Sequence, residues 1–236
     1  EIRKYLFPNK KDEKYKAGDT RGWKLLKARE LIKDNNHDAF IKKINYRPFD
    51  DRYIYYSTDM IDWSREKVMN NFLNKENIGF ITNRQCQTKN YQHAFITNII
   101  NDFHITETAN ANPYTFPLYL YPDENSLTTE RTPNLNLEIV KEIEEKLNLT
   151  FVSEKEDNSS TFAPIDILDY IYAVLHSPTY RETYKEFLKI DFPRVPFPHV
   201  ETFWQLVACG SKLRALHLLE DESLNERIIE IDDGHP

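Results

Sequence analysis

Residues 169–198 decide the fold, and they read DYIYAVLHSPTYRETYKEFLKIDFPRVPFP. Apolar side chains recur at helical spacing over residues 167–175 and again over residues 180–188. Between the two stripes, Ser177-Pro178 supplies a helix N-cap followed by proline at the first helical position. The prolines within residues 193–198 remove backbone donors and favour an extended path. The stretch therefore predicts a helical hairpin that is closed by a stiff proline strap.

The neighbouring segments of the second half are also patterned for helices. A charged helix with one apolar face is expected over residues 136–147, and a polar loop over residues 152–161 separates it from the hairpin. The last apolar run, residues 203–219, contains Gly210-Ser211. This pair predicts either a helix C-cap followed by a new N-cap or a glycine tolerated inside one long helix.

The first half has the texture of a small β-rich unit. After a polar, unpatterned lead-in, one helix is expected over residues 20–33 and another over residues 65–73. Short runs of β-branched and aromatic residues predict strands at residues 53–56, 78–82, 94–97 and 118–121. The turn residues that separate these elements are Pro48, Asn77 with Gly79, and Pro113.

The predicted fold class is therefore α+β, with a β-rich mixed-sheet half packed on a C-terminal helical half. We expect a flexible lead-in at residues 1–19, a helix plus the β-rich half at 20–135, the helical half at 136–220 and an acidic tail at 221–236. A chain of 236 residues is long enough for one good core or for two small, intimately packed lobes.

Composition narrows the class of protein. Hydrophobic residues make up 40% of the chain, and no run approaches the roughly 18 apolar residues that a membrane helix needs. No signal peptide is visible, and Cys86 and Cys209 lie too far apart in the sequence to indicate a disulfide framework or a four-ligand zinc site. These features predict a cytoplasmic protein. The chain begins with Glu1 rather than Met, as expected of a piece of something longer.

Charge is divided unequally between the two halves. The formal net charge of the chain is −7, but residues 1–100 carry a net charge of +7 and residues 101–236 carry −14. Seven acidic residues and one arginine lie after Leu219, so much of the negative charge belongs to the terminal tail. A basic face on the first half is compatible with a nucleic-acid partner, and a solvated surface is the alternative.

The sequence lacks the motifs of two kinds of nucleotide-binding site, the methyl-donor site of methyltransferases and the phosphate loop of helicases. The spacing of its five glycines gives no Gly-x-Gly turn for a methyl-donor cofactor and no phosphate loop of the Gly-x-x-x-x-Gly-Lys type. Asn112-Pro113-Tyr114 lacks the second proline of the loop that holds a flipped adenine in methyltransferases, and we interpret it as a turn. Neither methyltransferase nor helicase chemistry is expected here.

Metal-dependent and nucleophilic catalysis are not expected either. Asp12-Glu13-Lys14 and Glu144-Glu145-Lys146 have the residue types of a nuclease metal site, but we place the first in the lead-in and the second on a solvated helix face. His104, His176 and His217 fall in or beside apolar runs, where a structural role is the better interpretation. The segment is predicted to hold no catalytic residue and no metal ligand.

The remaining possibility is molecular recognition. Side chains that can hydrogen-bond to DNA bases are most concentrated between Asn83 and Gln92. Guanidinium and amide groups are concentrated there, and carboxylates are missing. Arginine reads guanine and Asn or Gln reads adenine, each bidentate pair contributing about 1 to 3 kcal/mol of discrimination. The candidate DNA-binding residues of this run are Asn83, Arg84, Gln85, Gln87, Lys89, Asn90 and Gln92. An ordinary polar loop between two strands is the alternative.

Further candidates are charged residues that would contact DNA phosphates. Lys42, Lys43 and Arg52 complete the predicted DNA-binding set, because phosphate contacts position a duplex without reading it. Arg52 and Arg47 flank Pro48-Phe49-Asp50-Asp51, so ion pairs that hold a turn explain these arginines equally well.

The strap and several ordered motifs resemble the C-terminal specificity domain of type ISP restriction-modification enzymes. The resemblance spans roughly residues 20–220 and rests on the order of the motifs more than on any one of them. Besides the hairpin and strap, these motifs are Trp23-Lys24-Leu25 with Ala28-Arg29, Tyr46-Arg47-Pro48-Phe49-Asp50-Asp51-Arg52 with Tyr55-Tyr56, Phe116-Pro117-Leu118-Tyr119-Leu120-Tyr121-Pro122, and Leu213 with Leu216-His217-Leu218-Leu219.

Several functional expectations follow from this resemblance alone. It implies a target-recognition domain that binds double-stranded DNA and holds it against an adenine methyltransferase in the same parent chain, which also carries helicase and nuclease parts and serves in phage defence. S-adenosylmethionine, ATP and Mg²⁺ are implied for the parent chain, and no cofactor is implied for this segment. Two alternatives stay open: a docking module that does not touch DNA, and a stand-alone nuclease or methyltransferase with unrecognised motifs.

Overall fold

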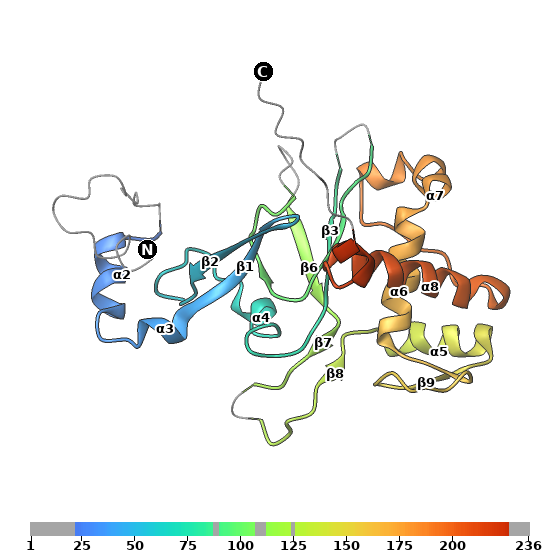
Figure 1. Ribbon diagram of the computed structural model, residues 1–236, viewed down its shortest axis with the longest axis horizontal. Helices are drawn as coiled ribbons and strands as arrows, with labels where there is room; N and C mark the ends of the chain where they lie inside the picture. Colours follow the sequence, from blue (N-terminus) through green and yellow to red (C-terminus); the bar gives the residue numbers. More distant parts are fainter. Residues whose placement is uncertain (1–21, 87–89, 107–111, 124–125, 227–236) are drawn as a thin grey trace.

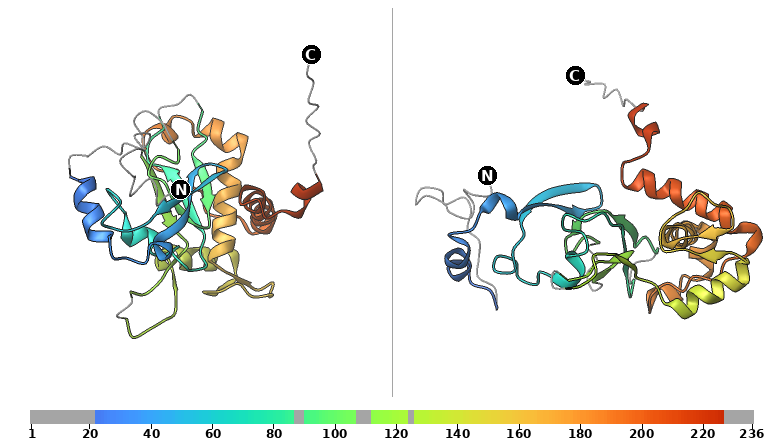
Figure 2. Two further views of the ribbon diagram at one scale, coloured as in Figure 1. Left: turned by 60° about the vertical axis from the view of Figure 1, so that its left-hand side comes forward. Right: turned by 90° about the horizontal axis from the view of Figure 1, so that it is seen from below.

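The computed structural model describes residues 22–86, 90–106, 112–123 and 126–226. The molecule is elongated, with the helices α2 (Leu25–Ile32) and α3 (His37–Phe40) at one end and the helices of the second half at the other (Figures 1 and 2). Small sheets lie between them. The described part of the chain therefore has the predicted α+β class.

The described residues form four small sheets, three in the β-rich half and one two-stranded ribbon in the helical half. The first has the order β2-β1-β5 and is mixed, since β1 is antiparallel to β2 and parallel to β5. The second is antiparallel with the order β4-β3-β6, and β7-β8 and β9-β10 form two-stranded ribbons. The bounds are β1 Ile41–Arg47, β2 Asp50–Tyr55, β3 Gly79–Asn83, β4 Ala94–Thr97, β5 Ile100–Asn101, β6 Pro113–Pro117, β7 Tyr119–Leu120, β8 Thr132–Pro133, β9 Thr150–Phe151 and β10 Thr161–Phe162.

Local sequence signals located some strands and missed others. The strand expected at residues 94–97 is β4 to the residue, and β3 begins one residue later than expected. Pro113, a predicted turn residue, is instead the first residue of β6, a position where proline costs no ladder hydrogen bond. No residue of β1 was among the predicted runs. The helix expected over residues 65–73 is only the short α4 (Glu66–Met69).

The helical half is built around the contact between α6 (Pro164–His176) and α8 (Val200–His217). Gly210 lies inside α8, so residues 203–217 belong to one long helix and not to two. The other helices are α5 (Leu137–Leu147), α7 (Pro178–Thr183) and two 3-10 turns, η1 (Phe187–Lys189) and η2 (Glu222–Glu226). The hairpin is confirmed, but its second arm is short, because α7 ends at Thr183 and only the 3-10 turn η1 follows.

A serine caps the second arm of the hairpin and ties it to the turn before it. The Oγ of Ser177 accepts a hydrogen bond from the backbone N–H of Tyr180, and Pro178 is the first residue of α7. The strap is tied to the hairpin by two tyrosines, since the hydroxyl of Tyr170 donates to the carbonyl of Pro196 and that of Tyr180 donates to the carbonyl of Arg194. Residues 193–198 therefore follow an extended path over the hairpin.

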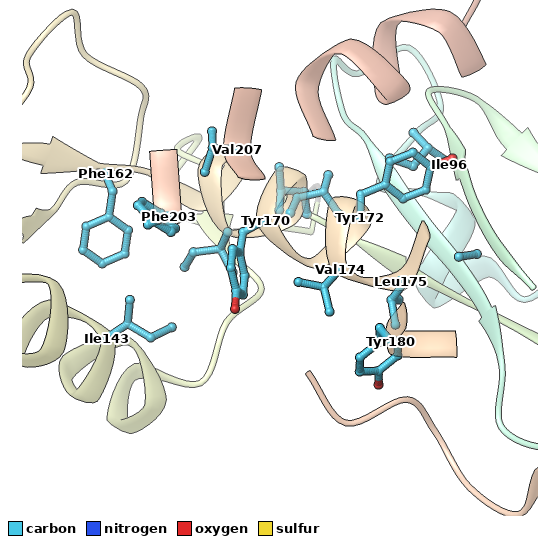
Figure 3. Packing of buried hydrophobic residues seen from close by; sticks show 14 of the residues in the cluster. Ile96, Ile143, Phe162, Tyr170, Tyr172, Val174, Leu175, Tyr180, Phe203 and Val207 are labelled. Carbon is cyan, nitrogen blue, oxygen red and sulfur yellow. The ribbon is translucent and has the colours of Figure 1, made fainter. Parts of the chain in front are cut away.

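One large core joins the two halves. Tyr172, Phe162 and Phe203 are its largest fully buried side chains, and they pack with Ile96 of β4 and with α5 (Figure 3). Because β4 contacts both α6 and α8, the second sheet is fixed against the helical half. The loop that follows β3 is consequently carried on a rigid base.

The N-cap of α5 gives a measurable test of this local reasoning. The Oδ1 of Asn136 accepts hydrogen bonds from the backbone N–H groups of Glu138 and Ile139, at 2.9 and 3.3 Å. We expect Asn136→Ala to lower the free energy of unfolding by about 0.5 to 2 kcal/mol. Urea unfolding monitored by circular dichroism measures the loss. Asn136→Asp keeps the acceptor and is the control, and an equal loss in both variants would contradict the cap.

Candidate nucleic-acid interface

The predicted recognition run leaves the end of β3 and is anchored by three buried side chains. The hydroxyl of Tyr91 lies 2.8 Å from the Oγ1 of Thr82 on β3, and the Sγ of Cys86 lies 3.1 Å from the Nδ1 of His93. Cys86, Tyr91 and His93 are all buried. These contacts pin both ends of the loop to the core, so the loop starts and finishes at fixed points.

The two ring side chains of the anchor are uncharged near neutral pH. Burial raises the pKa of the Tyr91 hydroxyl, and burial together with the nearby Arg181 lowers the pKa of the His93 imidazole. Both groups are therefore held in their neutral forms. A neutral anchor leaves the charge of the loop to its exposed side chains.

The exposed side chains of the run are those with recognition chemistry. Arg84, Gln85, Asn90 and Gln92 are exposed, while the anchoring residues between them are buried. Gln87 and Lys89, which are also predicted to contact DNA, lie outside the described residues. The structure thus presents guanidinium and amide groups at the surface of an anchored loop, where they are accessible to base edges.

Two of these exposed groups are held against the start of the strap. The Nε of Arg84 lies 3.1 Å from the Oδ1 of Asp191, and the amide of Gln85 is 3.5 Å from the carbonyl oxygen of Ile190. The backbone N–H of Phe192 and the Arg84 guanidinium hold the pKa of Asp191 below its ordinary value. The pair is solvent-exposed, so its partners separate at little energetic cost.

Asn83 differs from the rest of the predicted set. Its side chain is only 1% exposed, and its Oδ1 accepts a 2.7 Å hydrogen bond from the hydroxyl of Thr106. The residue ends β3 in the interior, where its amide fixes the connection to residue 106. We therefore leave Asn83 out of the surface that faces a ligand.

The phosphate-contact candidates lie on the β1-β2 ribbon, and each has a partner. Arg52 makes a fork-like contact with the carboxylate of Asp50, with Nη2 2.7 Å from Oδ2, and Lys43 lies 2.8 Å from Asp51. Hydrogen bonding lowers the pKa of Asp50 and raises that of Lys43. Lys42 donates to the Oδ1 of Asn74 at 3.2 Å. All these contacts are exposed, so the cations remain accessible.

Arg47 confirms part of the alternative interpretation of this ribbon. Its Nη1 lies 3.1 Å from the Oδ1 of Asp102, and this pair is only about a quarter exposed. The guanidinium also lies over the ring of Tyr46. Arg47 therefore holds the ribbon against the segment after β5, whereas Arg52 forms a surface pair.

The structure does not gather all candidates into one cluster. The β1-β2 ribbon packs against α3, whereas the connection from β3 to β4 lies beside α7 (Figure 1). The two sets are therefore separate patches on an elongated molecule. A ligand that contacts both must itself be extended.

Sequence reasoning missed a polar cavity between the loop and α7. Its volume is about 280 Å³, and it is lined by Asn90, Tyr91, Gln92, His176, Pro178, Arg181, Glu182 and Lys185. By sequence, Arg181 belongs only to the packing of the hairpin. The available signal was a basic residue on each of two successive turns after Pro178, although its meaning depends on the loop that lies opposite.

A second groove is apolar, and none of the candidate DNA-binding residues lines it. Its volume is about 450 Å³, and it is formed by α5, α6 and the strap. Among the described residues, no group of three or more His, Cys, Asp or Glu side chains is placed to hold a metal ion. The helices described also include none that is long and apolar enough to cross a membrane.

Comparison with known proteins identifies the family. The model of the family described as the type ISP C-terminal specificity domain matches residues 1–235. The chain belongs to this family. The resemblance carried by the hairpin, the strap and the ordered motifs is thereby confirmed. A search of curated proteins gave no match for this specificity domain.

Solved structures share the fold. One is a cryo-electron microscopy structure of a DrdV–DNA complex, with a TM-score of 0.64 and 23% identity over 92% of this chain. The type ISP restriction-modification enzyme LlaBIII bound to DNA gives 0.58 and 23% over 76%. A nuclease-deletion mutant of the type ISP enzyme LlaGI in complex with a DNA substrate mimic gives 0.52 and 24% over 76%. The specificity domain spans 20%, 11% and 14% of the lengths of those chains.

Proposed function

We propose that this domain recognises a specific sequence in double-stranded DNA. The observation that carries the proposal is the family match to a specificity domain over residues 1–235, and the anchored loop after β3 supplies the chemistry. Arg84, Gln85 and Gln92 offer donors and acceptors with the geometry that base edges accept. Carboxylates, which phosphates repel, are absent from the run between Asn83 and Gln92.

The loop after β3 and the β1-β2 ribbon have different roles in this function. The loop reads base edges, with Asn90 and with Gln87 and Lys89 as further candidates. Lys42, Lys43 and Arg52 on the β1-β2 ribbon contact phosphates, exchanging their exposed partners for the DNA backbone. This exchange is favourable because phosphate contacts release counterions, which also makes the affinity fall steeply with salt.

The role within a larger enzyme is part of the same proposal. We place the domain in a chain that also contains methyltransferase, helicase and nuclease parts, since it spans a fifth or less of the lengths of the DNA-bound structures that share its fold. The domain holds the duplex so that the methyltransferase reaches an adenine. S-adenosylmethionine, ATP and Mg²⁺ belong to those other parts, and the domain itself contributes binding energy and not chemistry.

The double variant Arg84→Ala with Gln85→Ala tests the reading role. Each lost bidentate contact removes about 1 to 3 kcal/mol of discrimination, so loss of both contacts should lower the preference for the cognate duplex over a scrambled one by about 30-fold or more. Competition binding with fluorescent duplexes measures this ratio. Lys141→Ala, on the outer face of α5, removes one exposed charge elsewhere and serves as the control. Unchanged discrimination in the double variant would remove the loop from the reading role.

A docking module that does not touch DNA is the second candidate, and the apolar groove beside α5 favours it. The two functions predict different salt dependence. DNA recognition requires an affinity for duplex that falls steeply between about 50 and 200 mM salt. A docking module shows no such binding at any salt concentration, so one titration separates the candidates.

A further inference from the structure

The polar cavity between the loop and α7 contains a positive charge that has no counter-ion among the described residues. The Nε of Arg181 donates a 2.6 Å hydrogen bond to the carbonyl oxygen of Leu175, which fixes the guanidinium beside the end of α6. The rest of the group faces a cavity bordered by Asn90 and Gln92. Within the described ranges of the chain, no ion pair joins Arg181 to a carboxylate.

Two other partly buried arginines of the chain are each paired with a carboxylate. Arg214 is paired with the buried carboxylate of Asp169, and Arg131 is paired with Glu154. The carboxylate that borders the Arg181 cavity is Glu182, and it pairs with Lys185. Arg181 is half-buried, and burial lowers the pKa of its guanidinium. Tyr91 and Tyr172 border it in their neutral forms, so they do not neutralise the charge.

A partly desolvated guanidinium in a polar cavity is a favourable binding site for an oxyanion, because the oxyanion supplies the missing negative charge. Arginine presents its N–H groups as a planar fork that matches a phosphate in two parallel hydrogen bonds. Lys185 offers a second cation on the same wall, one turn further along, and the amides of Asn90 and Gln92 offer donors from the opposite wall. The donors therefore surround the cavity from the loop and from α7.

We propose that this cavity binds one phosphate group of the DNA backbone, with Arg181 as the principal contact and Lys185 as the second. The inference rests on the proposed function and extends it to α7. A phosphate could also come from a free nucleotide or from inorganic phosphate, which has the same chemistry. Its position beside exposed Gln92 favours the duplex, because the phosphates of a duplex border the groove in which base edges are read.

The consequence is a role for the hairpin beyond packing. Residues 90–92 and α7 would bind the DNA sugar-phosphate backbone. Arg84 and Gln85, at the other end of the same loop, would contact the bases. A phosphate contact fixes the register of the protein on the duplex and carries no sequence information. Loss of this contact should therefore weaken binding to every sequence by a similar factor.

Three variants test the phosphate site. Arg181→Gln and Lys185→Gln should each lower the affinity for cognate and scrambled duplexes about tenfold near 0.1 M salt, and each should reduce the slope of log affinity against log salt by about 1. Glu182→Gln removes the negative charge from the cavity and should raise the affinity. Lys189→Gln is the matched control, because Lys189 pairs with Glu186 at the same helical spacing but lies outside the cavity.

The outcomes separate this inference from the proposed function. Wild-type affinity and salt slope in both Arg181→Gln and Lys185→Gln, alongside lost discrimination in the Arg84 and Gln85 variant, would overturn the phosphate site alone. Absence of salt-dependent duplex binding by the wild type would overturn both. If Arg181→Gln does not fold by circular dichroism, Lys185→Gln and Glu182→Gln decide. Saturable binding of inorganic phosphate or ATP that Arg181→Gln abolishes, with duplex affinity unchanged, would reject the duplex as the source.

Discussion

Replacing Gly210 with alanine is expected to destabilise the domain by about 3 kcal/mol, at the upper end of the usual cost of overpacking. A Cβ at this position would lie 1.8 Å from the backbone carbonyl oxygen of Asp169 on α6. That atom is part of a helix backbone and cannot move aside as a flexible side chain would. The two helices must separate, and the contact between α6 and α8 organises the core of the second half.

The direction of the stability change in Gly210→Ala distinguishes the effect of packing from that of helix propensity. In an exposed helix, replacing glycine with alanine stabilises by about 1 kcal/mol, because alanine has the higher helix propensity. Gly210 lies in the middle of α8, so propensity and packing predict opposite results. Urea unfolding of Gly210→Ala measures the balance. Gly22→Ala is the control, because a Cβ on Gly22 would meet no described atom within 4 Å. A stabilised Gly210→Ala protein would show that α6 and α8 can move apart freely.

Gly210 also shows where local pattern stops being informative. The Gly210-Ser211 pair fits a helix break and a continuous helix equally well by sequence, since both choices satisfy local rules. The close approach of Asp169, 41 residues earlier in the chain, decides for the continuous helix. By contrast, Ser177-Pro178 was placed correctly as a helix start, because a cap depends on atoms within a few residues of itself.

Part of the candidate site could likewise be predicted from the sequence, and part depends on contacts with distant residues. The concentration of amide and guanidinium groups between Asn83 and Gln92 is visible in the sequence, but the run has no period that separates inner from outer side chains. Partners outside the run make that separation. Thr106 buries the amide of Asn83, and Thr82 holds the hydroxyl of Tyr91. Arg181 was missed for a related reason, since the cavity around it is completed by the loop and not by its own helix.

The second large effect concerns the ion pair that α6 and α8 share. The carboxylate of Asp169 is 3% exposed and the guanidinium of Arg214 is 17% exposed, and they meet in a fork of two hydrogen bonds at 2.7 and 3.0 Å. Arg214→Met keeps much of the side-chain volume but leaves the carboxylate buried without its partner. We expect a loss of about 3 to 5 kcal/mol in the free energy of unfolding, measured by urea denaturation at pH 7.

Removal of both charges should cost much less than removal of one. In Arg214→Met with Asp169→Asn, the buried group is a neutral amide, so the large desolvation penalty disappears. The double variant should therefore recover most of the stability that Arg214→Met loses. If the two substitutions add, or if Asp169→Asn alone is as harmful as Arg214→Met, then the interaction is not governed by the buried carboxylate.

The pH dependence of the single variant identifies the carboxylate directly. Burial already raises the pKa of Asp169 above its ordinary value, and Arg214 is the main group that opposes this rise. Without Arg214 the pKa rises further, so the folded state binds a proton more tightly than the unfolded chain does. Stability then increases as the pH falls through the raised pKa toward the unfolded value of about 4. The stability difference between wild type and Arg214→Met should accordingly shrink from pH 7 to pH 5. A difference that is constant over this range would mean that Arg214 stabilises the domain through packing and not through the charge of Asp169.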